Sequence, residues 1–397
     1  MRAIVYSQTG DPDVLRLVDR PVPEPGPGEV RVAVRVSGVN PTDWKARRGA
    51  RPGERPPFAE MVPNQDGAGI IDGVGEGVDS ALAGQRVWIC EAAWQRAEGS
   101  AQEYIVLPAR QAVPLPDAAS FDLGASLGIP ALTAHRCLTV SDEGPRSLAP
   151  GALAGRTVLV AGGAGAVGHA AIQLARWADA QVVATISTQR KAELARAAGA
   201  DRAVDYRRRH AVDEIRALAP EGVDLIVEVA PAANADLDAG VLAENGTVAA
   251  YATDGGGELT VSVRGLMYRN IRYQFVLVYT VPVEAKKIAV ADVSAALADG
   301  RSPSAKKPDC PYTASRSSKP LMRMQPSKPG PSGRCWWTSR RLLDVKKNVE
   351  PVALSSASPS DFSPWRPVSW WSFLPALRAR RCCQLRRSTG GRHPGFH

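Results

Sequence analysis

Short apolar runs alternate with Ala-rich amphipathic segments between residues 157 and 251. The runs have the length and the Val and Ile content of buried strands, and the segments between them repeat their apolar positions with the period of a helix. This alternation predicts βαβ units, and therefore an α/β fold with a parallel, doubly wound sheet. The expected strands cover 158–160, 182–186, 203–206, 223–229 and 246–251, and the clearest helical patterns cover 170–175, 191–198 and 212–219.

The first of these strands runs into a glycine-rich loop that reads Val-Ala-Gly-Gly-Ala-Gly-Ala-Val-Gly over residues 160–168. In this G-x-G-x-x-G pattern, Gly163 permits a tight turn, Gly165 lets the backbone approach phosphates, and Gly168 lets the helix pack close to the strand. Ala166 and Val167 lie at the start of that helix, whose N-terminal N–H groups attract an anion. The strand, loop and helix in this order predict a dinucleotide site; a purely structural glycine turn is the alternative.

The end of the next strand, 182–186, indicates which dinucleotide is bound. A site for NAD places Asp or Glu about 20 residues past the glycines, where the carboxylate binds the ribose 2′-hydroxyl. This chain has Ser187-Thr188-Gln189-Arg190-Lys191 there, and hydroxyls and cations suit a 2′-phosphate that a carboxylate repels. The segment favours NADP(H) over NAD(H), with a solvated helix start at Arg190 and Lys191 as the alternative.

Residues 1–120 have a different pattern, in which short Val-rich strands are separated by clusters of Pro and Gly. Dense turn signals between short strands predict an all-β, barrel-like unit. Because pockets are common at junctions between domains, we expect the substrate site in a cleft between this unit and the nucleotide-binding unit.

Five sequence blocks in order make the chain similar to a known family. They cover residues 38–43, 62–69, 84–87, 99–104 and 127–134, and read GVNPTD, VPNQDGAG, GQRV, GSAQEY and LGIPALTA. From Met1 to about Gly300 the chain resembles the zinc-independent quinone oxidoreductases of the medium-chain dehydrogenase/reductase superfamily, which include zeta-crystallin. The resemblance implies a GroES-like β-barrel catalytic domain over 1–121, a Rossmann NADP-binding domain over 122–282, and a helix over 283–301 that returns to the catalytic domain.

The resemblance also implies the residues on the substrate side of the site. Asn40 and Thr133 are expected beside the nicotinamide, and Asp43 is expected to order the loop that carries Asn40. Taken alone, Asn40 is a turn residue and Thr133 a buried helix residue. Lys45 and Arg51 stand near positions where relatives carry pocket tyrosines, and either stabilise a developing anion or coat a solvated loop.

On the cofactor side, the resemblance assigns the 2′-phosphate to Lys191 and Tyr206, in agreement with the charge argument for Lys191. Ser187 and Thr253, with the glycine loop, complete the residues expected to contact NADP(H). Taken alone, Tyr206 is a packing residue at a strand end.

The chain lacks the ligand pattern of a zinc site. Catalytic zinc takes three Cys, His or carboxylate ligands, and structural zinc takes four with closely spaced cysteines. Where zinc-dependent relatives carry Cys and Gly-His-Glu, this chain carries Asn40 and Asn64-Gln65-Asp66, and Cys90 and Cys137 are its only cysteines before residue 302. We therefore expect no metal, and we expect His135 and His169 to pack in helices.

Without a Lewis acid nothing polarises an unactivated carbonyl, so the substrate has to be electrophilic itself. A quinone or an α,β-unsaturated carbonyl meets this requirement, with NADPH as the hydride donor and the protein as the orienting scaffold. The sequence thus predicts a zinc-independent NADPH:quinone oxidoreductase; the alternative is an NADPH-binding protein with little or no catalysis. The strand-like segment 271–279 is a candidate homodimer edge, although a strand inside the sheet would show the same pattern.

The net charge of +9 belongs to the end of the chain. Residues 302–397 contain 18 Lys and Arg against 4 Asp and Glu, whereas residues 1–301 contain 31 against 36. The basic balance is therefore no evidence of a specific nucleic-acid site on the enzyme. Because the sequence shows no apolar run of membrane-spanning length and no signal segment, we expect a cytoplasmic protein without membrane contact.

The family pattern stops near residue 302, and we interpret residues 302–397 as a basic tail that is either frame-shifted or disordered. Trp336-Trp337-Thr338 must be encoded TGG-TGG-ACN, and one base earlier the same bases encode Val followed by an acidic residue, as in the family's closing strand. We predict that the coding DNA over residues 299–307 has lost or gained a base, and sequencing from the source checks this. An intact DNA frame identical to the printed one would instead mean a genuine basic extension.

Overall fold

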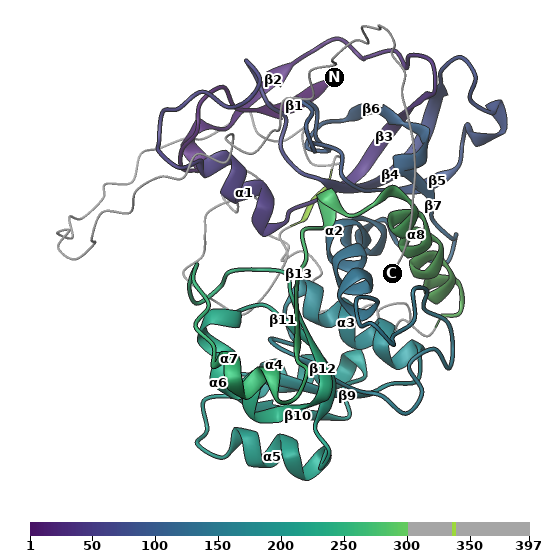
Figure 1. Ribbon diagram of the computed structural model, residues 1–397. Helices are drawn as coiled ribbons and strands as arrows, with labels where there is room; N and C mark the ends of the chain where they lie inside the picture. Colours follow the sequence, from purple (N-terminus) through teal and green to yellow (C-terminus); the bar gives the residue numbers. More distant parts are fainter. Residues whose placement is uncertain (301–335, 339–397) are drawn as a thin grey trace, which may run out of the picture. The chain divides into compact units, whose positions relative to one another are not determined.

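Two β-sheets and the helices between them position the site (Figure 1). The computed structural model describes residues 1–300 and 336–338, which all fall in one unit, Met1–Val349. The interpretation of residues 302–397 as a tail therefore lies outside the described residues, apart from the backbone of 336–338.

The N-terminal part of the chain folds into antiparallel strands, as its turn-rich pattern predicts. Alternate valines of β3, from Val30 to Val36, are buried while the residues between them are not, so one face of the sheet covers a core. The sheet order is β14-β3-β4-β5-β7, with β6 also paired to β3, and β1 and β2 form a separate two-stranded sheet in which Ala3 of β1 also bridges to Gln102. The elements are β1 Arg2–Val5, β2 Arg16–Asp19, β3 Glu29–Gly38, α1 Pro41–Arg48, β4 Asp66–Val74, β5 Arg86–Ile89, β6 Tyr104–Pro108, β7 Ala112–Pro114 and β14 Trp336–Thr338, with 3-10 helices at Pro12–Val14, Ser80–Leu82 and Ala109–Gln111.

A second sheet confirms the predicted parallel, doubly wound fold. Its strand order is β10-β9-β8-β11-β12-β13, and each neighbouring pair is parallel. In such a sheet the order reverses between β8 and β11, and dinucleotides bind beyond the carboxyl ends of the strands at that point. The elements are β8 Thr157–Val160, α3 Ala166–Trp177, β9 Gln181–Ile186, α4 Gln189–Ala198, β10 Arg202–Asp205, α5 Ala211–Leu218, β11 Val223–Glu228, α6 Pro231–Val241, β12 Leu242–Ala250, α7 Val263–Met267 and β13 Arg272–Phe275.

The segment 271–279 differs from the single strand that its apolar run suggests. Only Arg272–Phe275 forms strand β13, at the edge of the described sheet, and the chain then turns through the 3-10 helix η4, Val278–Thr280. The hydrogen bonds show where the chain leaves the sheet. Val276 N–H still donates to Ala250 C=O of β12, whereas Thr280 N–H donates to Leu277 C=O and closes a local turn. This turn carries Tyr279 toward the site described below.

Helix α8, Val283–Ala298, lies within the segment 283–301 expected to be helical, and packs against α2, Phe121–Leu138, and α3. Its Asp292 accepts hydrogen bonds from Leu148 N–H at 2.6 Å and Ser147 Oγ at 3.0 Å. His135 of α2, expected only to pack, lies with its Nε2 2.7 Å from Asp292 Oδ2. Burial raises the pKa of Asp292, but these partners outweigh burial and lower it overall. The group ties α8 to α2.

A buried pair of carboxyls lies behind the cofactor edge of the parallel sheet. Glu228, the last residue of β11, and Asp238 of α6 are both 0% exposed. Glu228 Oε1 accepts hydrogen bonds from Asn234 Nδ2 at 2.9 Å and from Ala230 N–H, and the Glu228 and Asp238 carboxyls form a hydrogen bond with each other. Two carboxylates cannot both keep their charge in such a place, so the pair holds a proton. Burial, followed by the charge of Glu228, raises the pKa of Asp238 to about 9.

This pair predicts a pH dependence of stability. The folded state keeps a proton on Asp238 between its ordinary pKa of 3.8 and about 9, whereas the unfolded state loses it, so stability is greatest at the acid end of that window and falls as pH rises. We expect Asp238→Asn to make the slope of unfolding free energy against pH shallower between about pH 5 and 8, by up to about 1.4 kcal/mol per pH unit. Urea denaturation at several pH values measures this. Asp213→Asn, at an exposed aspartate, is the control, and equal slopes in both variants would contradict the shared proton.

Candidate active site

Asp66 joins three segments of the chain. It is fully buried at the start of β4. Its Oδ2 accepts a hydrogen bond from Asn40 Nδ2 at 2.8 Å, and its Oδ1 accepts one from Ile129 N–H at 2.9 Å. Because Asn40 precedes α1 and Ile129 lies in α2, one carboxylate holds both helices to β4.

Helix α2 bends where it meets this carboxylate. Gly128 has non-helical angles of φ −34° and ψ −105°, and Pro130 follows two residues later. A Cβ on Gly128 would lie 2.0 Å from Asp66 Oδ1, so only glycine fits. At the bend, Ile129 N–H donates to Asp66 instead of to a carbonyl of its own helix. A side chain that takes the place of a helical hydrogen bond in this way is a known cause of helix kinks.

The structure brings Asn40 and Thr133 to this same centre. Asn40 is the N-cap of α1, 2% exposed, and its N–H donates to Asp43 Oδ2 at 2.6 Å. Asp43 Oδ1 accepts from Gln65 N–H at 3.1 Å, so Asp43 ties the Asn40 loop to the residue before Asp66. Thr133 is buried, and its hydroxyl donates to Ile129 C=O at 2.6 Å.

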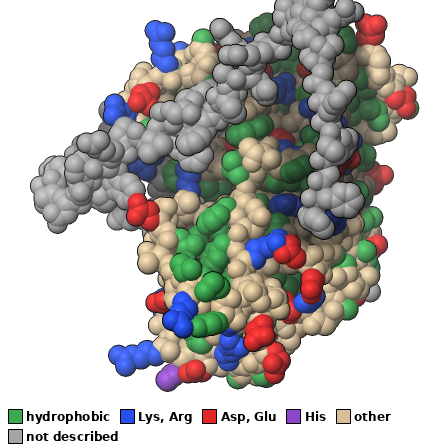
Figure 2. Space-filling view, in the orientation of Figure 1, with side chains coloured by type: hydrophobic (Ala, Val, Ile, Leu, Met, Phe, Trp, Pro, Cys, Tyr) green, Lys and Arg blue, Asp and Glu red, His purple; other side chains and the backbone are tan. Residues whose placement is uncertain are grey.

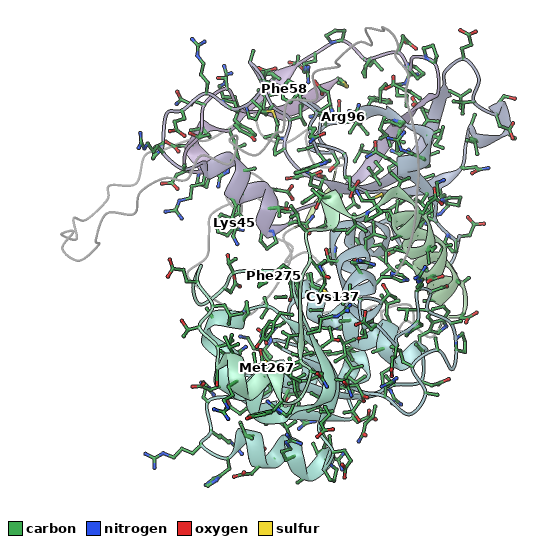
Figure 3. All side chains as sticks on the ribbon, in the orientation of Figure 1. Lys45, Phe58, Arg96, Cys137, Met267 and Phe275 are labelled. Carbon is green, nitrogen blue, oxygen red and sulfur yellow. The ribbon has the colours of Figure 1, made fainter. Side chains whose placement is uncertain are left out.

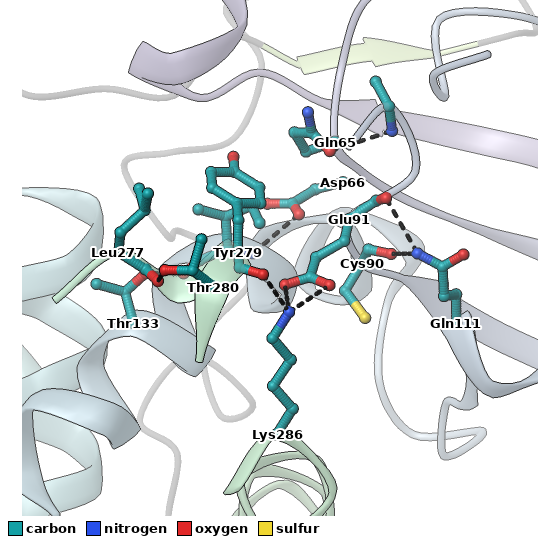
Figure 4. Close-up of polar contacts among 12 residues, drawn as sticks. Gln65, Asp66, Cys90, Glu91, Gln111, Thr133, Leu277, Tyr279, Thr280 and Lys286 are labelled. Atoms are coloured by element: carbon teal, nitrogen blue, oxygen red, sulfur yellow. Dashed lines mark hydrogen bonds and ion pairs between the residues drawn. The ribbon is translucent and has the colours of Figure 1, made fainter. Parts of the chain in front are cut away.

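Helix η4 and the start of α8 form another side of the site (Figure 4). The ring of Tyr279 stacks on Trp94 with centroids 4.4 Å apart and planes at 15°. Its hydroxyl lies 3.0 Å from Thr42 Oγ1 in the first turn of α1. Lys286 Nζ donates to both carboxylate oxygens of Glu91, at 2.7 and 2.9 Å, and to Tyr279 C=O at 2.8 Å. Burial raises the pKa of Glu91, and the Lys286 ammonium offsets this only in part.

Lys45 and Arg51 lie at the surface. Lys45 is labelled on α1 in Figure 3; its side chain is 48% exposed and its Nζ is 3.9 Å from Asp254 Oδ1. Arg51 is also exposed. The exposure of both side chains favours the interpretation that they coat a solvated loop.

The glycine loop turns at a residue just before the predicted motif. The left-handed residue is Gly162, with φ 65°, while Gly163 is needed for space, since a Cβ there would lie 2.7 Å from Ala184 Cβ. Gly168 is also closely packed, because a Cβ on it would lie 2.6 Å from the carbonyl oxygen of Gly162, so helix and loop touch there. Gly165 is the N-cap of α3, and a Cβ on it would meet only Gly162 C=O, at 3.2 Å. The loop therefore presents an open backbone surface at the start of a helix, as a diphosphate requires.

The ends of β9 and β10 bring three other predicted residues together. Lys191 Nζ donates to Ser187 Oγ at 2.9 Å, and both residues are half-buried. Tyr206 N–H donates to Ile186 C=O at 3.3 Å, which places Tyr206 beside the end of β9 with 44% of its surface exposed. Arg190, in contrast, is exposed. A paired ammonium and hydroxyl beside an exposed phenol fit a phosphate better than a solvated helix start does.

Thr253 lies in the loop after β12, at the same carboxyl edge of the sheet as the glycine loop. It is exposed, and its C=O accepts from Gly256 N–H at 3.2 Å. The geometry thus places every predicted cofactor residue on one edge of the sheet, and the substrate-side residues around Asp66.

Comparison with known proteins agrees with this geometry. The profile of the alcohol dehydrogenase GroES-like domain matches residues 26–117, and that of the zinc-binding dehydrogenase family matches residues 166–295. The quinone oxidoreductase of Lama guanicoe is 33% identical over 261 residues, which cover 65% of this chain and 75% of that protein. The chain belongs to the quinone oxidoreductase family.

Further relatives of the chain include a longer protein and several solved structures. The synaptic vesicle membrane protein VAT-1 homologue of Rattus norvegicus is 34% identical over 230 residues, 57% of this chain, and the chain spans about half, 53%, of that protein. A mycobacterial quinone oxidoreductase has a TM-score of 0.65 at 29% identity, with 76% of this chain and 89% of that chain covered. The quinone oxidoreductase of Thermus thermophilus has a TM-score of 0.60 at 26% identity, with 76% and 87% covered.

Two residues at the centre of the candidate site are not identified as functional by the sequence. Asp66 stands out there only as a replacement for a zinc ligand, and Tyr279 only as part of an apolar strand. The signal for Asp66 is present in the Gly-x-Pro pattern of α2, because a helix that carries both Gly128 and Pro130 needs an outside partner for its bent backbone. For Tyr279 the sequence offers no comparable signal.

Among residues 1–300 and 336–338, no group of three or more His, Cys, Asp or Glu side chains could hold a metal ion. Within the same described part of the chain, no helix is long and apolar enough to span a bilayer. A cytoplasmic location stays a prediction from the sequence.

Proposed function

We propose that this chain is an NADPH-dependent reductase that passes hydride to a quinone or an α,β-unsaturated carbonyl without zinc. The observation that supports this most is the open glycine loop at the switch point of the sheet, with the Lys191–Ser187 pair at the end of the next strand. Solved structures of the mycobacterial and Thermus relatives include complexes with NADPH. The observed loop and pair suit the same cofactor.

The proposal assigns the cofactor's parts to named residues. NADPH, when bound, supplies the hydride at nicotinamide C4. Gly163, Gly165 and Gly168 keep the loop free of side chains where the diphosphate approaches, and the N–H groups of Ala166 and Val167 at the start of α3 would bind it.

Residues at the ends of the neighbouring strands β9 and β10 bind the 2′-phosphate. Lys191 meets it as an ammonium, Ser187 and Tyr206 as hydroxyls, and Thr253 borders the cofactor from the loop after β12.

On the substrate side, the hydrogen bonds already in place limit what each residue does. The Thr133 hydroxyl gives its proton to Ile129 C=O, so its oxygen is an acceptor and suits the amide N–H of the nicotinamide. Asp66 fixes the orientation of the Asn40 amide, and Asp43 orders the Asn40 loop. These residues orient the reacting groups, and the substrate has to be electrophilic because the proposed reaction uses no Lewis acid.

We also assign residues 1–121 to a catalytic domain, 122–282 to the cofactor domain, and 283–301 to a helix that returns to the catalytic domain. The Lys286–Glu91 ion pair supports this last assignment, because it joins α8 to the loop after β5.

Turnover tests the proposal. We expect the protein to oxidise NADPH with a simple quinone such as menadione, and to prefer NADPH to NADH. Lys191→Ala should raise the KM for NADPH about tenfold, because it removes one charged hydrogen bond to the 2′-phosphate, and leave the KM for NADH unchanged. Absorbance of NADPH at steady state measures both.

Lys287→Ala is the matched control, because Lys287 is exposed on α8 and pairs with Glu284 in its own helix. Saturable NADPH binding without turnover of any quinone or enone would support the alternative, a binding protein with little catalysis. A chain that binds neither nucleotide would overturn both.

We infer that a second copy of the chain is the partner of the edge strand β13. The strand lies at the end of the described sheet order, and large apolar side chains beside it are exposed: Phe275 and Met267 by 63%, Tyr268 by 67% and Val263 by 73%. Figure 2 shows apolar side chains gathered on this face, and Figure 3 labels Met267 and Phe275 there. An edge strand flanked by apolar side chains is a surface that proteins normally cover.

We expect a dimer in sedimentation velocity experiments, and we expect Phe275→Asp to shift it to the monomer because the charge would have to be buried. Phe58→Asp, at an apolar residue of the N-terminal part that is 39% exposed, should leave the dimer intact. A wild-type monomer at all concentrations, or a dimer unaffected by Phe275→Asp, would contradict this interface.

A further inference from the structure

We propose that the Tyr279 hydroxyl donates a hydrogen bond to the substrate's carbonyl oxygen. The proposal rests on the proposed reductase function and adds the group that receives the charge formed by hydride transfer. It assigns to η4, a turn of the nucleotide-binding part, a role in substrate binding.

Tyr279 reaches from one part of the site to the other. Helix η4 follows β13, at the carboxyl edge of the parallel sheet where the cofactor is expected. The phenol oxygen is 3.0 Å from Thr42 Oγ1, and Thr42 lies two residues after Asn40. The hydroxyl therefore lies at the first turn of α1, next to the loop that Asp43 and Asp66 hold in place.

The ring is held firmly enough to act as a fixed donor. Trp94 stacks on it at 4.4 Å, and Lys286 holds the Tyr279 carbonyl at 2.8 Å while it pairs with Glu91. The side chain of Tyr279 is 7% exposed. A donor fixed before the reaction stabilises charge without the cost of reorganising, which is the condition for effective transition-state stabilisation.

Two other donors near Asp66 already have protein partners. One N–H of the Asn40 amide is given to Asp66, and the Thr133 hydroxyl gives its proton to Ile129 C=O. The hydroxyls of Thr42 and Tyr279 share one hydrogen bond, which either can donate. When Thr42 donates it, the Tyr279 proton is available for a substrate oxygen, and the two bonds strengthen each other.

The electrostatics of the site keep the phenol in its donor form. Burial, followed by the negative charge of Asp43, raises the pKa of Tyr279, and the nearby carboxylates of Asp66 and Glu91 act in the same direction. The hydroxyl therefore stays protonated at neutral pH. Packing against Trp94 requires only a ring, which phenylalanine would supply, so the buried hydroxyl is the part that packing does not explain.

NADPH, when bound, would supply hydride to the β-carbon of the conjugated carbonyl. The C=C π pair then forms a double bond to the carbonyl carbon, and the C=O π pair moves to the oxygen. Tyr279 donates a hydrogen bond to that oxygen and keeps its own proton. Water is the proton donor: it protonates the α-carbon of an enone product to give the ketone, whereas for a quinone it protonates the oxygen, and transfer of a proton from the ring carbon to the second carbonyl oxygen completes the hydroquinone.

Tyr279→Phe tests the proposal because it keeps the stack on Trp94 and removes only the hydroxyl. We expect kcat/KM for menadione to fall at least about tenfold, since the lost bond forms fully only in the transition state. The Kd for NADPH should stay within about twofold. The affinity of menadione for the protein without NADPH, measured by quenching of tryptophan fluorescence, should fall about threefold.

Tyr104→Phe is the matched control, because Tyr104 lies on β6 beside Arg31 in the N-terminal sheet. Unchanged turnover and menadione affinity in Tyr279→Phe would overturn the proposal while leaving the reductase function intact. If the wild type turns over no quinone or enone, the proposed function fails, and menadione affinity alone decides whether Tyr279 binds a carbonyl. Should Tyr279→Phe not fold, Thr42→Val serves, with about threefold lower kcat/KM expected from loss of the supporting bond and no change contradicting it.

Discussion

The buried carboxylate of Asp66 is the constraint on which the site depends. A charge removed from water is stable only when it is hydrogen-bonded, and here the partners include the Asn40 amide and Ile129 N–H. Satisfying the second partner forces α2 to bend at Gly128, where no side chain would fit. The bend in turn places Thr133 one turn further along the same helix. One electrostatic requirement thus determines where two of the expected nicotinamide residues lie.

Helix α8 supplies the second constraint, because it fixes the segment that carries Tyr279. Lys286 at its start holds Glu91 and the Tyr279 carbonyl, and Asp292 further along holds α2 through His135. The Lys286–Glu91 and Asp292–His135 pairs are polar and largely buried, so loss of one partner would leave the other unpaired and lower the free energy of unfolding. The positions of the Tyr279 segment and of α2 therefore both depend on α8, the helix that follows the nucleotide-binding sheet in sequence.

The sequence predicted the parallel sheet and the glycine loop, because both depend on patterns within short segments of the chain. The alternation of strands and helices indicated the parallel sheet, and the glycine loop lies between its expected strand and helix, although the left-handed turn is at Gly162 rather than Gly163. The contacts of Asp66 with Ile129 and of Tyr279 with Thr42 join residues far apart in the chain. No period or spacing encodes such pairs, and the apolar run 271–279 concealed a turn because a buried 3-10 helix needs apolar residues just as a strand does.

The pairing of β14 with β3 covers the edge of the N-terminal sheet next to the site. Trp336–Thr338 pair antiparallel with Val36–Gly38, directly before the Asn40 loop. Antiparallel pairing is made by backbone N–H and C=O groups. Strand β6 pairs with Glu29–Ala33 in the first half of β3, so β14 continues the pairing of β3 to the residue two before Asn40.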